Sequence, residues 1–135
     1  MKDKYKHAYM DIAVRFGQTS TAVRKKVGAI LVKNDSCIAL GVNGTPPGWA
    51  DEVCEGPDGQ TLPVVRHAEA ACLEKLWNSS ETAQGSVMFI SCAPCLNCSI
   101  KITTAGIKKV YFREAYRDNG GLDYLRSKQI EVEQI

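Results

Sequence analysis

Residues 86–98 read Ser-Val-Met-Phe-Ile-Ser-Cys-Ala-Pro-Cys-Leu-Asn-Cys, and this stretch joins a strand signal to a helix start. The run from Ser86 to Ser91 is short, apolar and continuous, which is typical of a buried strand. Pro94 suits the entry to a helix, and we expect that helix to run from Cys95 to Ala105. A strand followed directly by a helix indicates an α/β fold.

The rest of the chain continues this alternation. We expect helices over residues 4–17, 65–77 and 122–127 and strands over residues 27–32, 37–40, 110–112 and 130–132. The tight turn Asn34-Asp35-Ser36 joins the first two strands as a hairpin, and the helix between the last two should make them parallel. The sequence therefore predicts a three-layer α/β/α sandwich with a five-stranded mixed sheet, formed by one domain over residues 1–135.

Composition narrows the class of protein. A domain of 135 residues can bury roughly two-thirds of its unfolded surface. The N-terminus Met1-Lys2-Asp3-Lys4 is charged and no long apolar run follows, so we expect no signal peptide and no membrane association. Six cysteines in such a chain indicate reduced thiols and a cytoplasmic location. A net charge of +2 gives no sign of nucleic-acid binding.

One histidine and two cysteines form the candidate metal site. His67 falls in the first turn of the helix expected from Val65, and Cys95 and Cys98 share one face of the next helix. Such a ligand set suits a catalytic zinc, which keeps its fourth tetrahedral position for water. Glu69 adds the carboxylate that a hydrolytic zinc needs to carry protons. The pattern H-x-E…P-C-x-x-C is the signature of zinc-dependent nucleobase deaminases.

Cys92 leaves a second kind of zinc site open. Cys92-Ala93-Pro94-Cys95 overlaps the first Cys-x-x-Cys, so Cys92 could join the three other ligands in a closed structural site without room for water. The protein would then be a non-catalytic, zinc-stabilised binding module. However, Cys92 ends a buried strand, where a free cysteine is most simply a small core residue. A closed site would also leave Glu69 without a role.

Four stretches outside the metal site match a known family. They are Ser20–Arg24 with Val27–Ala29, Gly41–Gly48, Ala105–Val110, and Tyr116–Asp118 leading to Gly121-Leu122. On these residues the chain resembles the deoxycytidylate (dCMP) deaminases of the cytidine deaminase superfamily over nearly its whole length. The resemblance implies a cytidine deaminase-like fold and zinc-dependent hydrolysis of dCMP to dUMP with release of ammonia, in the synthesis of the dTMP precursor.

The resemblance also assigns roles at the reacting base. Glu69 would take a proton from water, deliver it to N3 as C4 is attacked, and then help to protonate the leaving amine. Asn43 would bind the deoxyribose hydroxyl and the backbone N–H of Ala68 the base carbonyl. Tyr116 would form a wall of the base pocket. Only one zinc is expected per chain, because the long loop keeps only Cys54 of the residues with which some members hold a second ion.

A nucleotide substrate would give Ser20, Thr21 and Arg24 a role. Two hydroxyl groups and a guanidinium suit a phosphate dianion. The alternative for the basic cluster Arg24-Lys25-Lys26 is a solvated entrance to a strand.

A deaminase of free cytidine or deoxycytidine, or of cytosine in nucleic acid, is the alternative function within the same superfamily.

The long loop of residues 43–63 is rich in Gly, Pro and acidic residues and has no apolar period, which is typical of a functional loop. Many dCMP deaminases are homohexamers that dCTP activates together with Mg²⁺ and that dTTP inhibits. The resemblance places Asn43, Gly44 and Thr45 in the part of the family that builds this allosteric site.

Overall fold

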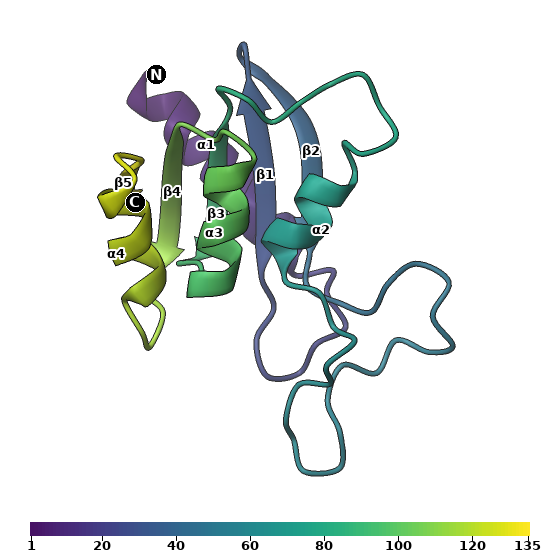
Figure 1. Cartoon of the computed structure of the whole chain (residues 1–135). Helices are drawn as coiled ribbons and strands as arrows, with labels where there is room; N and C mark the ends of the chain where they lie inside the picture. Colours follow the sequence, from purple (N-terminus) through teal and green to yellow (C-terminus); the bar gives the residue numbers. More distant parts are fainter.

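A mixed β-sheet of five strands runs through the molecule in the order β2-β1-β3-β4-β5 (Figure 1). The computed structural model describes residues 1–135. The strands are β1 (Gly28–Lys33), β2 (Ser36–Val42), β3 (Val87–Cys92), β4 (Lys109–Glu114) and β5 (Glu131–Gln134). β1 pairs antiparallel with β2 and β3, while β3, β4 and β5 are parallel neighbours. The predicted parallel pairing of the last two strands is confirmed.

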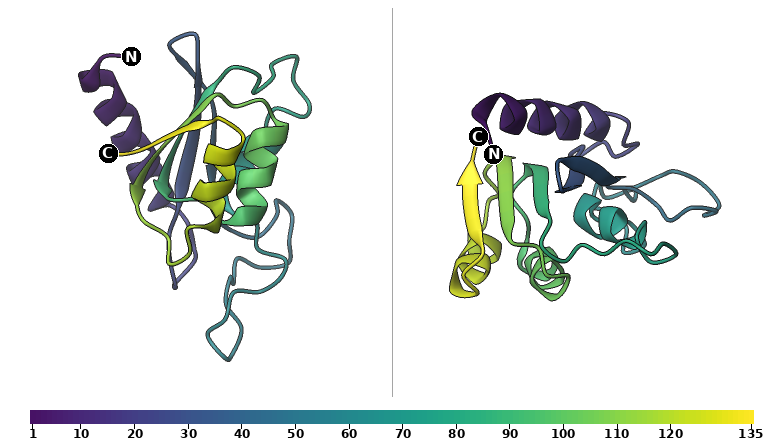
Figure 2. Two further views of the ribbon diagram at one scale, coloured as in Figure 1. Left: turned by 60° about the vertical axis from the view of Figure 1, so that its left-hand side comes forward. Right: turned by 90° about the horizontal axis from the view of Figure 1, so that it is seen from above.

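Helices cover both faces of the sheet, as Figure 2 shows from above. α1 (Asp3–Gly17) lies on one face, and α2 (Ala68–Glu74), α3 (Leu96–Thr104) and α4 (Gly120–Ser127) lie on the other. The predicted α/β/α sandwich with a five-stranded mixed sheet is therefore confirmed.

The sheet separates two apolar clusters because successive side chains of a strand point to opposite faces. Ile30 and Phe89 pack with Met10 of α1 on one face. Leu31 and Ile90 belong to the larger cluster under α2, α3 and α4. Burial on both faces explains why the central strands are continuously apolar in sequence.

Two backbone details hold the first two strands and α2 in place. Asn34 and Asp35 have positive φ values of 52° and 60°, the geometry of a two-residue hairpin turn that asparagine and aspartate tolerate. At Gly41, an added Cβ would lie 2.6 Å from the carbonyl oxygen of Ala68 and 2.8 Å from the Cα of Cys72. Glycine therefore allows α2 to lie directly on β2.

Some element boundaries differ from the predictions. α2 begins at Ala68 and ends at Glu74, so the prediction that His67 lies inside the first turn of a helix over residues 65–77 is wrong. His67 is instead the N-cap residue, with an extended backbone (ψ 158°). Cys95 likewise precedes α3 as its N-cap, with ψ 171°. A residue just outside a helix can turn its side chain across the helix end, which a residue inside the first turn cannot do as freely.

Residues 43–67 form the long loop below β2 in Figure 1 and contain no helix or strand. Two isolated backbone pairings, Gly44 with Arg66 and Glu55 with Thr61, shape it. No helix of the chain has the length and apolar character needed to cross a membrane.

Candidate active site

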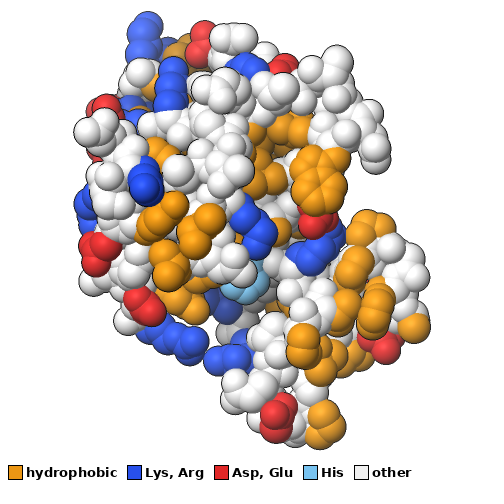
Figure 3. Space-filling model, viewed as in Figure 1, with side chains coloured by type: hydrophobic (Ala, Val, Ile, Leu, Met, Phe, Trp, Pro, Cys, Tyr) orange, Lys and Arg blue, Asp and Glu red, His pale blue; other side chains and the backbone are white.

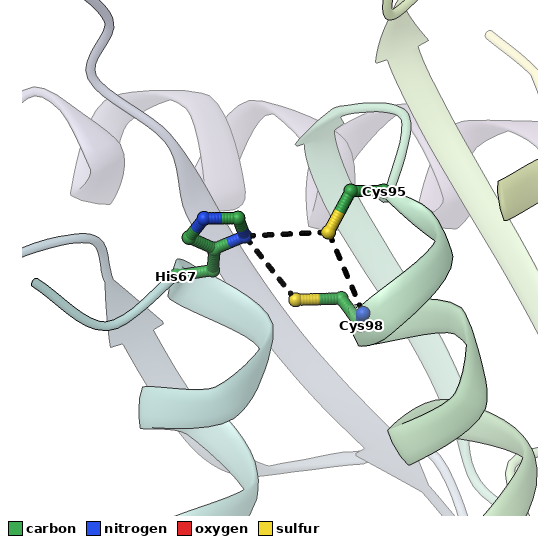
Figure 4. Close-up of side chains that lie close together, drawn as sticks. All are labelled: His67, Cys95 and Cys98. Carbon is green, nitrogen blue, oxygen red and sulfur yellow. Dashed lines mark hydrogen bonds between the residues drawn. The ribbon is translucent and has the colours of Figure 1, made fainter. Parts of the chain in front are cut away.

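The N-terminal ends of α2 and α3 bring together the three predicted metal ligands (Figure 4). Nδ1 of His67 lies 3.5 Å from Sγ of Cys95 and 3.3 Å from Sγ of Cys98. The three ligand atoms all lie within 4.8 Å of one another. α2 and α3 lie on the same face of the sheet, and their N-terminal ends are directed at the same point. Residues far apart in sequence therefore meet there.

The donor set fits zinc. With Zn–N and Zn–S bonds of about 2.0 and 2.3 Å at tetrahedral angles, nitrogen and sulfur would be separated by about 3.5 Å. The two Nδ1–Sγ distances, 3.5 and 3.3 Å, match this separation closely. One imidazole and two thiols would supply three of the four ligands that zinc takes, which would leave one position for a small molecule.

The surroundings shift the pKa values of the two thiols in opposite directions. Hydrogen bonds with Cys98 and His67 lower the pKa of the Cys95 thiol, and the backbone N–H of Cys98 also donates to Sγ of Cys95 at 3.5 Å. The neighbouring Cys95 sulfur and burial raise the pKa of Cys98, while the hydrogen bond with Cys95 raises the pKa of His67. A bound dication would ionise both thiols and keep the imidazole neutral.

Cys92 stays outside the metal cluster. It is the last residue of β3, is 5% exposed, and is not among the residues whose ligand atoms converge. Burial raises the pKa of its thiol, which favours the neutral form. The geometry therefore supports an open three-ligand site over a closed Cys₃His site.

Glu69 lies beside the metal ligands and is only 4% exposed. It is the second residue of α2, and its side chain faces the cavity that His67 and Cys95 also line. Burial raises the pKa of its carboxyl group, while its own backbone N–H and nearby His67 act in the opposite direction. A buried carboxyl group with a raised pKa can both accept and release a proton near neutral pH.

A cavity of about 470 Å³ opens next to this cluster. Four of the predicted substrate-binding residues line it: Arg24, Asn43, Ala68 and Tyr116. They come from four separate parts of the chain, so the fold alone brings them to the metal site. The volume is in the range of small-molecule binding pockets.

Asn43 joins the cavity to the segment that precedes β1. Its Oδ1 accepts a hydrogen bond from the N–H of Val27 at 2.8 Å, and its Nδ2 donates to the carbonyl oxygen of Lys25 at 2.7 Å. The hydroxyl of Ser20 donates to the carbonyl of Asn43 at 2.7 Å. The amide of Asn43 is thereby held in one orientation at the cavity wall.

The other predicted binding residues make hydrogen bonds within the protein. The hydroxyl of Thr21 donates to the carbonyl of Glu52 at 2.7 Å, and neither Ser20 nor Thr21 lines the cavity. Their role as phosphate ligands stays a prediction. Gly44 exchanges backbone hydrogen bonds with Arg66, and the hydroxyl of Thr45 donates to the carbonyl of Asp51 at 3.1 Å. Their allosteric role also stays a prediction.

Three charged residues of the cavity, Lys25, Glu55 and Arg117, were not predicted as site residues. Lys25 pairs with Glu114 at 2.6 Å, and the guanidinium of Arg117 lies 5.4 Å from the ring centroid of Tyr116. Figure 3 shows basic side chains gathered around the histidine. The basic cluster at residues 24–26 was the available signal for Lys25 and the stretch Tyr116–Asp118 the one for Arg117, whereas Glu55 stands in no pattern that points to a cavity.

Metal-dependent hydrolases combine an open zinc-type ligand set with a group that carries protons, and this cavity wall offers His67, Cys95 and Cys98 for the first and Glu69 for the second. Residues 3–114 match the family model described as the cytidine and deoxycytidylate deaminase zinc-binding region. The chain belongs to this family.

Two relatives illustrate the similarity in sequence. The deoxycytidylate deaminase of Saccharomyces cerevisiae is 27% identical over all of this chain, and the chain spans only 46% of that protein's length. The deoxycytidylate deaminase of Mycobacterium phage D29 is 32% identical, with 77% of this chain and 90% of the phage protein covered.

A solved structure is similar over the whole chain. The crystal structure of the dCMP deaminase of cyanophage S-TIM5 in complex with dCMP and dUMP is 48% identical and covers 100% of this chain and 99% of that one. The TM-score is 0.98. The predicted family is thus confirmed.

Proposed function

We propose that this protein hydrolyses dCMP to dUMP and releases ammonia. The observation that carries the proposal is the convergence of His67, Cys95 and Cys98 within 4.8 Å, with buried Glu69 on the same cavity. The cyanophage protein, whose structure contains dCMP and dUMP, supports this substrate, since it is 48% identical over the full length of this chain.

The chemistry needs an activated water and a group that moves protons. Zinc held by His67, Cys95 and Cys98 would supply Lewis-acid activation of water at neutral pH. The carboxylate of Glu69 accepts the proton of the attacking water and delivers it to N3 as oxygen adds to C4. It then takes the proton of the new hydroxyl group on C4 and passes it to the amino group, which leaves as ammonia while the C4 carbonyl forms. Burial of Glu69 keeps bulk water from carrying these protons instead.

The base and sugar are oriented by the two sides of the cavity. Ala68 is the first residue of α2, so its backbone N–H has no partner within the helix and is free to donate to the carbonyl of the base. Asn43 lines the cavity and is held by Val27 and Lys25, and its amide would bind the deoxyribose hydroxyl. Tyr116 closes the base pocket.

The phosphate is recognised by cations on the cavity wall. Arg24, Lys25 and Arg117 all line the cavity, and a cluster of this kind suits a phosphate dianion rather than an uncharged nucleoside. This observation favours a nucleotide over free cytidine or deoxycytidine.

A substrate panel tests the proposal. The zinc-loaded protein is assayed with dCMP, CMP, deoxycytidine and single-stranded DNA, and we expect kcat/KM to be highest for dCMP. Preference for deoxycytidine or for DNA would favour the alternative deaminases. No turnover of any of the four, despite one bound zinc per chain, would favour a non-catalytic binding module.

We also propose a homo-oligomer, by resemblance a hexamer, that responds to dCTP with Mg²⁺ and to dTTP through the Asn43-Gly44-Thr45 segment. An apolar groove of about 480 Å³ between α2 and α3 supports association, because Trp77 at its edge is 76% exposed and Ile100 is also exposed. Analytical ultracentrifugation with and without each nucleotide tests both the oligomeric state and its response to nucleotides.

A cytoplasmic location, indicated by the six free cysteines, stays a prediction.

A further inference from the structure

A carboxylate from the long loop holds the backbone of the cavity's cationic segment. Oε2 of Glu55 accepts a hydrogen bond from the N–H of Val23 at 2.9 Å and from the N–H of Arg24 at 3.1 Å. Glu55 lies about thirty positions further along the chain, so this is a tertiary contact. Two adjacent backbone N–H groups that point at one oxygen form a small anion-binding concavity.

The same part of the loop also holds the Arg24 side chain. Nη1 of Arg24 donates to Oε1 of Gln60 at 3.2 Å. Glu55 pairs with Thr61, and Gly56 N–H donates to the carbonyl of Gln60 at 2.9 Å. Residues 55–61 therefore form a small hairpin that binds Arg24 through both its backbone and its guanidinium.

Other hydrogen bonds hold the two ends of the segment between α1 and β1, through Ser20 and Thr21 at one end and Lys25 and Val27 at the other. In the middle of the segment the side chain of Val23 is 85% exposed, so apolar packing does not anchor it, and Glu55 accepts the backbone hydrogen bonds of this part. Yet Arg24 and Lys25 must keep a fixed place on the cavity wall if they are to recognise a phosphate. Charge-assisted hydrogen bonds of the kind that Glu55 makes are the strong ones available for this purpose.

Glu55 itself lines the cavity, and its negative charge by itself would repel a phosphate. The contribution of Glu55 to the site must then come from the two backbone hydrogen bonds that it accepts. We propose that Glu55 is a positioning residue for phosphate recognition, which acts through the backbone of Val23 and Arg24 and not by contact with the substrate. This inference rests on the proposed nucleotide substrate.

The test compares Glu55→Ala with Glu55→Gln, with Glu52→Ala as the control. The Gln carbonyl oxygen can accept both N–H bonds, whereas Ala accepts none. The Glu52 side chain is exposed and makes no hydrogen bond or ion pair. We expect Glu55→Ala to raise KM for dCMP by about tenfold with kcat within about twofold, the loss of roughly one charged hydrogen bond. Glu55→Gln should stay within about threefold of the parent KM, and Glu52→Ala should match the parent.

Deoxycytidine separates phosphate recognition from damage to the fold. Its KM should be the same in the parent and in Glu55→Ala, because it has no phosphate to recognise. An unchanged or lower KM for dCMP in Glu55→Ala would overturn the inference, because the carboxylate would then only compete with phosphate. Equal losses on both substrates, or a Gln variant as impaired as the Ala variant, would overturn it too.

Amide hydrogen exchange in the substrate-free protein makes the inference independent of turnover. The N–H groups of Val23 and Arg24 should exchange about tenfold or more faster in Glu55→Ala than in the parent or in Glu55→Gln. If the parent does not act on dCMP, the proposed function fails, and so does the phosphate role of Glu55. If the parent does act on dCMP but the exchange of these two amides is unchanged, the positioning role alone fails.

Discussion

Replacement of Glu69 by Gln isolates proton transfer from every other role of the active site. The side chain is 4% exposed and lies at the second position of α2, so an uncharged residue of the same size fits without a new cavity. The three metal ligands belong to other positions, so zinc content should stay at one ion per chain. Since burial raises the pKa of Glu69, loss of its charge should leave the melting temperature unchanged or raised.

The expected loss follows from what the amide cannot do. Gln neither accepts the proton of water nor delivers one to N3, and no other carboxyl group lies beside the metal ligands to replace Glu69. We expect kcat for dCMP to fall by at least about a hundredfold, the scale of general acid–base catalysis, which corresponds to about 2.7 kcal/mol of transition-state stabilisation. The dissociation constant for dCMP should change by less than about threefold, because the contacts to base, sugar and phosphate are retained.

The assay combines steady-state release of dUMP, zinc analysis and calorimetric binding of dCMP on the same preparation. Glu69→Asp serves as the matched control, since it keeps the carboxyl group but shortens its reach and should retain partial activity. A Gln variant with near-parental kcat would refute the role of Glu69. Loss of zinc in that variant would show instead that Glu69 helps to hold the metal.

Four further substitutions test separate parts of the account. Arg24→Ala should raise KM for dCMP by about tenfold and leave weak turnover of deoxycytidine unchanged; equal losses would make Arg24 structural. Cys98→Ser should remove most of the zinc and lower the melting temperature, as measured by metal analysis and thermal unfolding. Cys92→Ala should keep one zinc per chain and most activity, and zinc loss there would mean that the closed site is the correct one. Gly41→Val should destabilise the fold by at least about 1–3 kcal/mol in chemical denaturation, because its side chain would overlap the backbone of α2; a neutral result would contradict that packing.

The sequence predicted the layers of the fold because local patterns determine them. The apolar run of β3 indicates burial on both faces, and Asn34-Asp35-Ser36 indicates a hairpin, whose turn in the structure is Asn34-Asp35 alone. The predicted start of α2 was a few residues too early and that of α3 was one residue too early. The spacing of apolar residues does not mark the last extended residue before a helix. That residue is in both cases a metal ligand, His67 or Cys95.

The metal site was predictable because its ligands recur at fixed local spacing. The cavity wall was only partly predictable. Glu55 meets Arg24, and the neighbours Tyr116 and Arg117 reach the cavity, through the path of loops, which has no periodic signature in the chain. Ser20 and Thr21 were expected to face a phosphate, and their hydroxyls donate to backbone carbonyl groups.

Zinc titration of the metal-stripped protein tests the central claim, which is that one zinc at His67, Cys95 and Cys98 supports hydrolysis of dCMP. Zinc is added in increments while bound metal, dUMP and ammonia are measured together. The account predicts that turnover rises in proportion to bound zinc and levels off at one ion per chain, with dUMP and ammonia released in equal amounts. Zinc bound at one ion per chain without turnover of dCMP would contradict it, and so would turnover that does not depend on bound zinc.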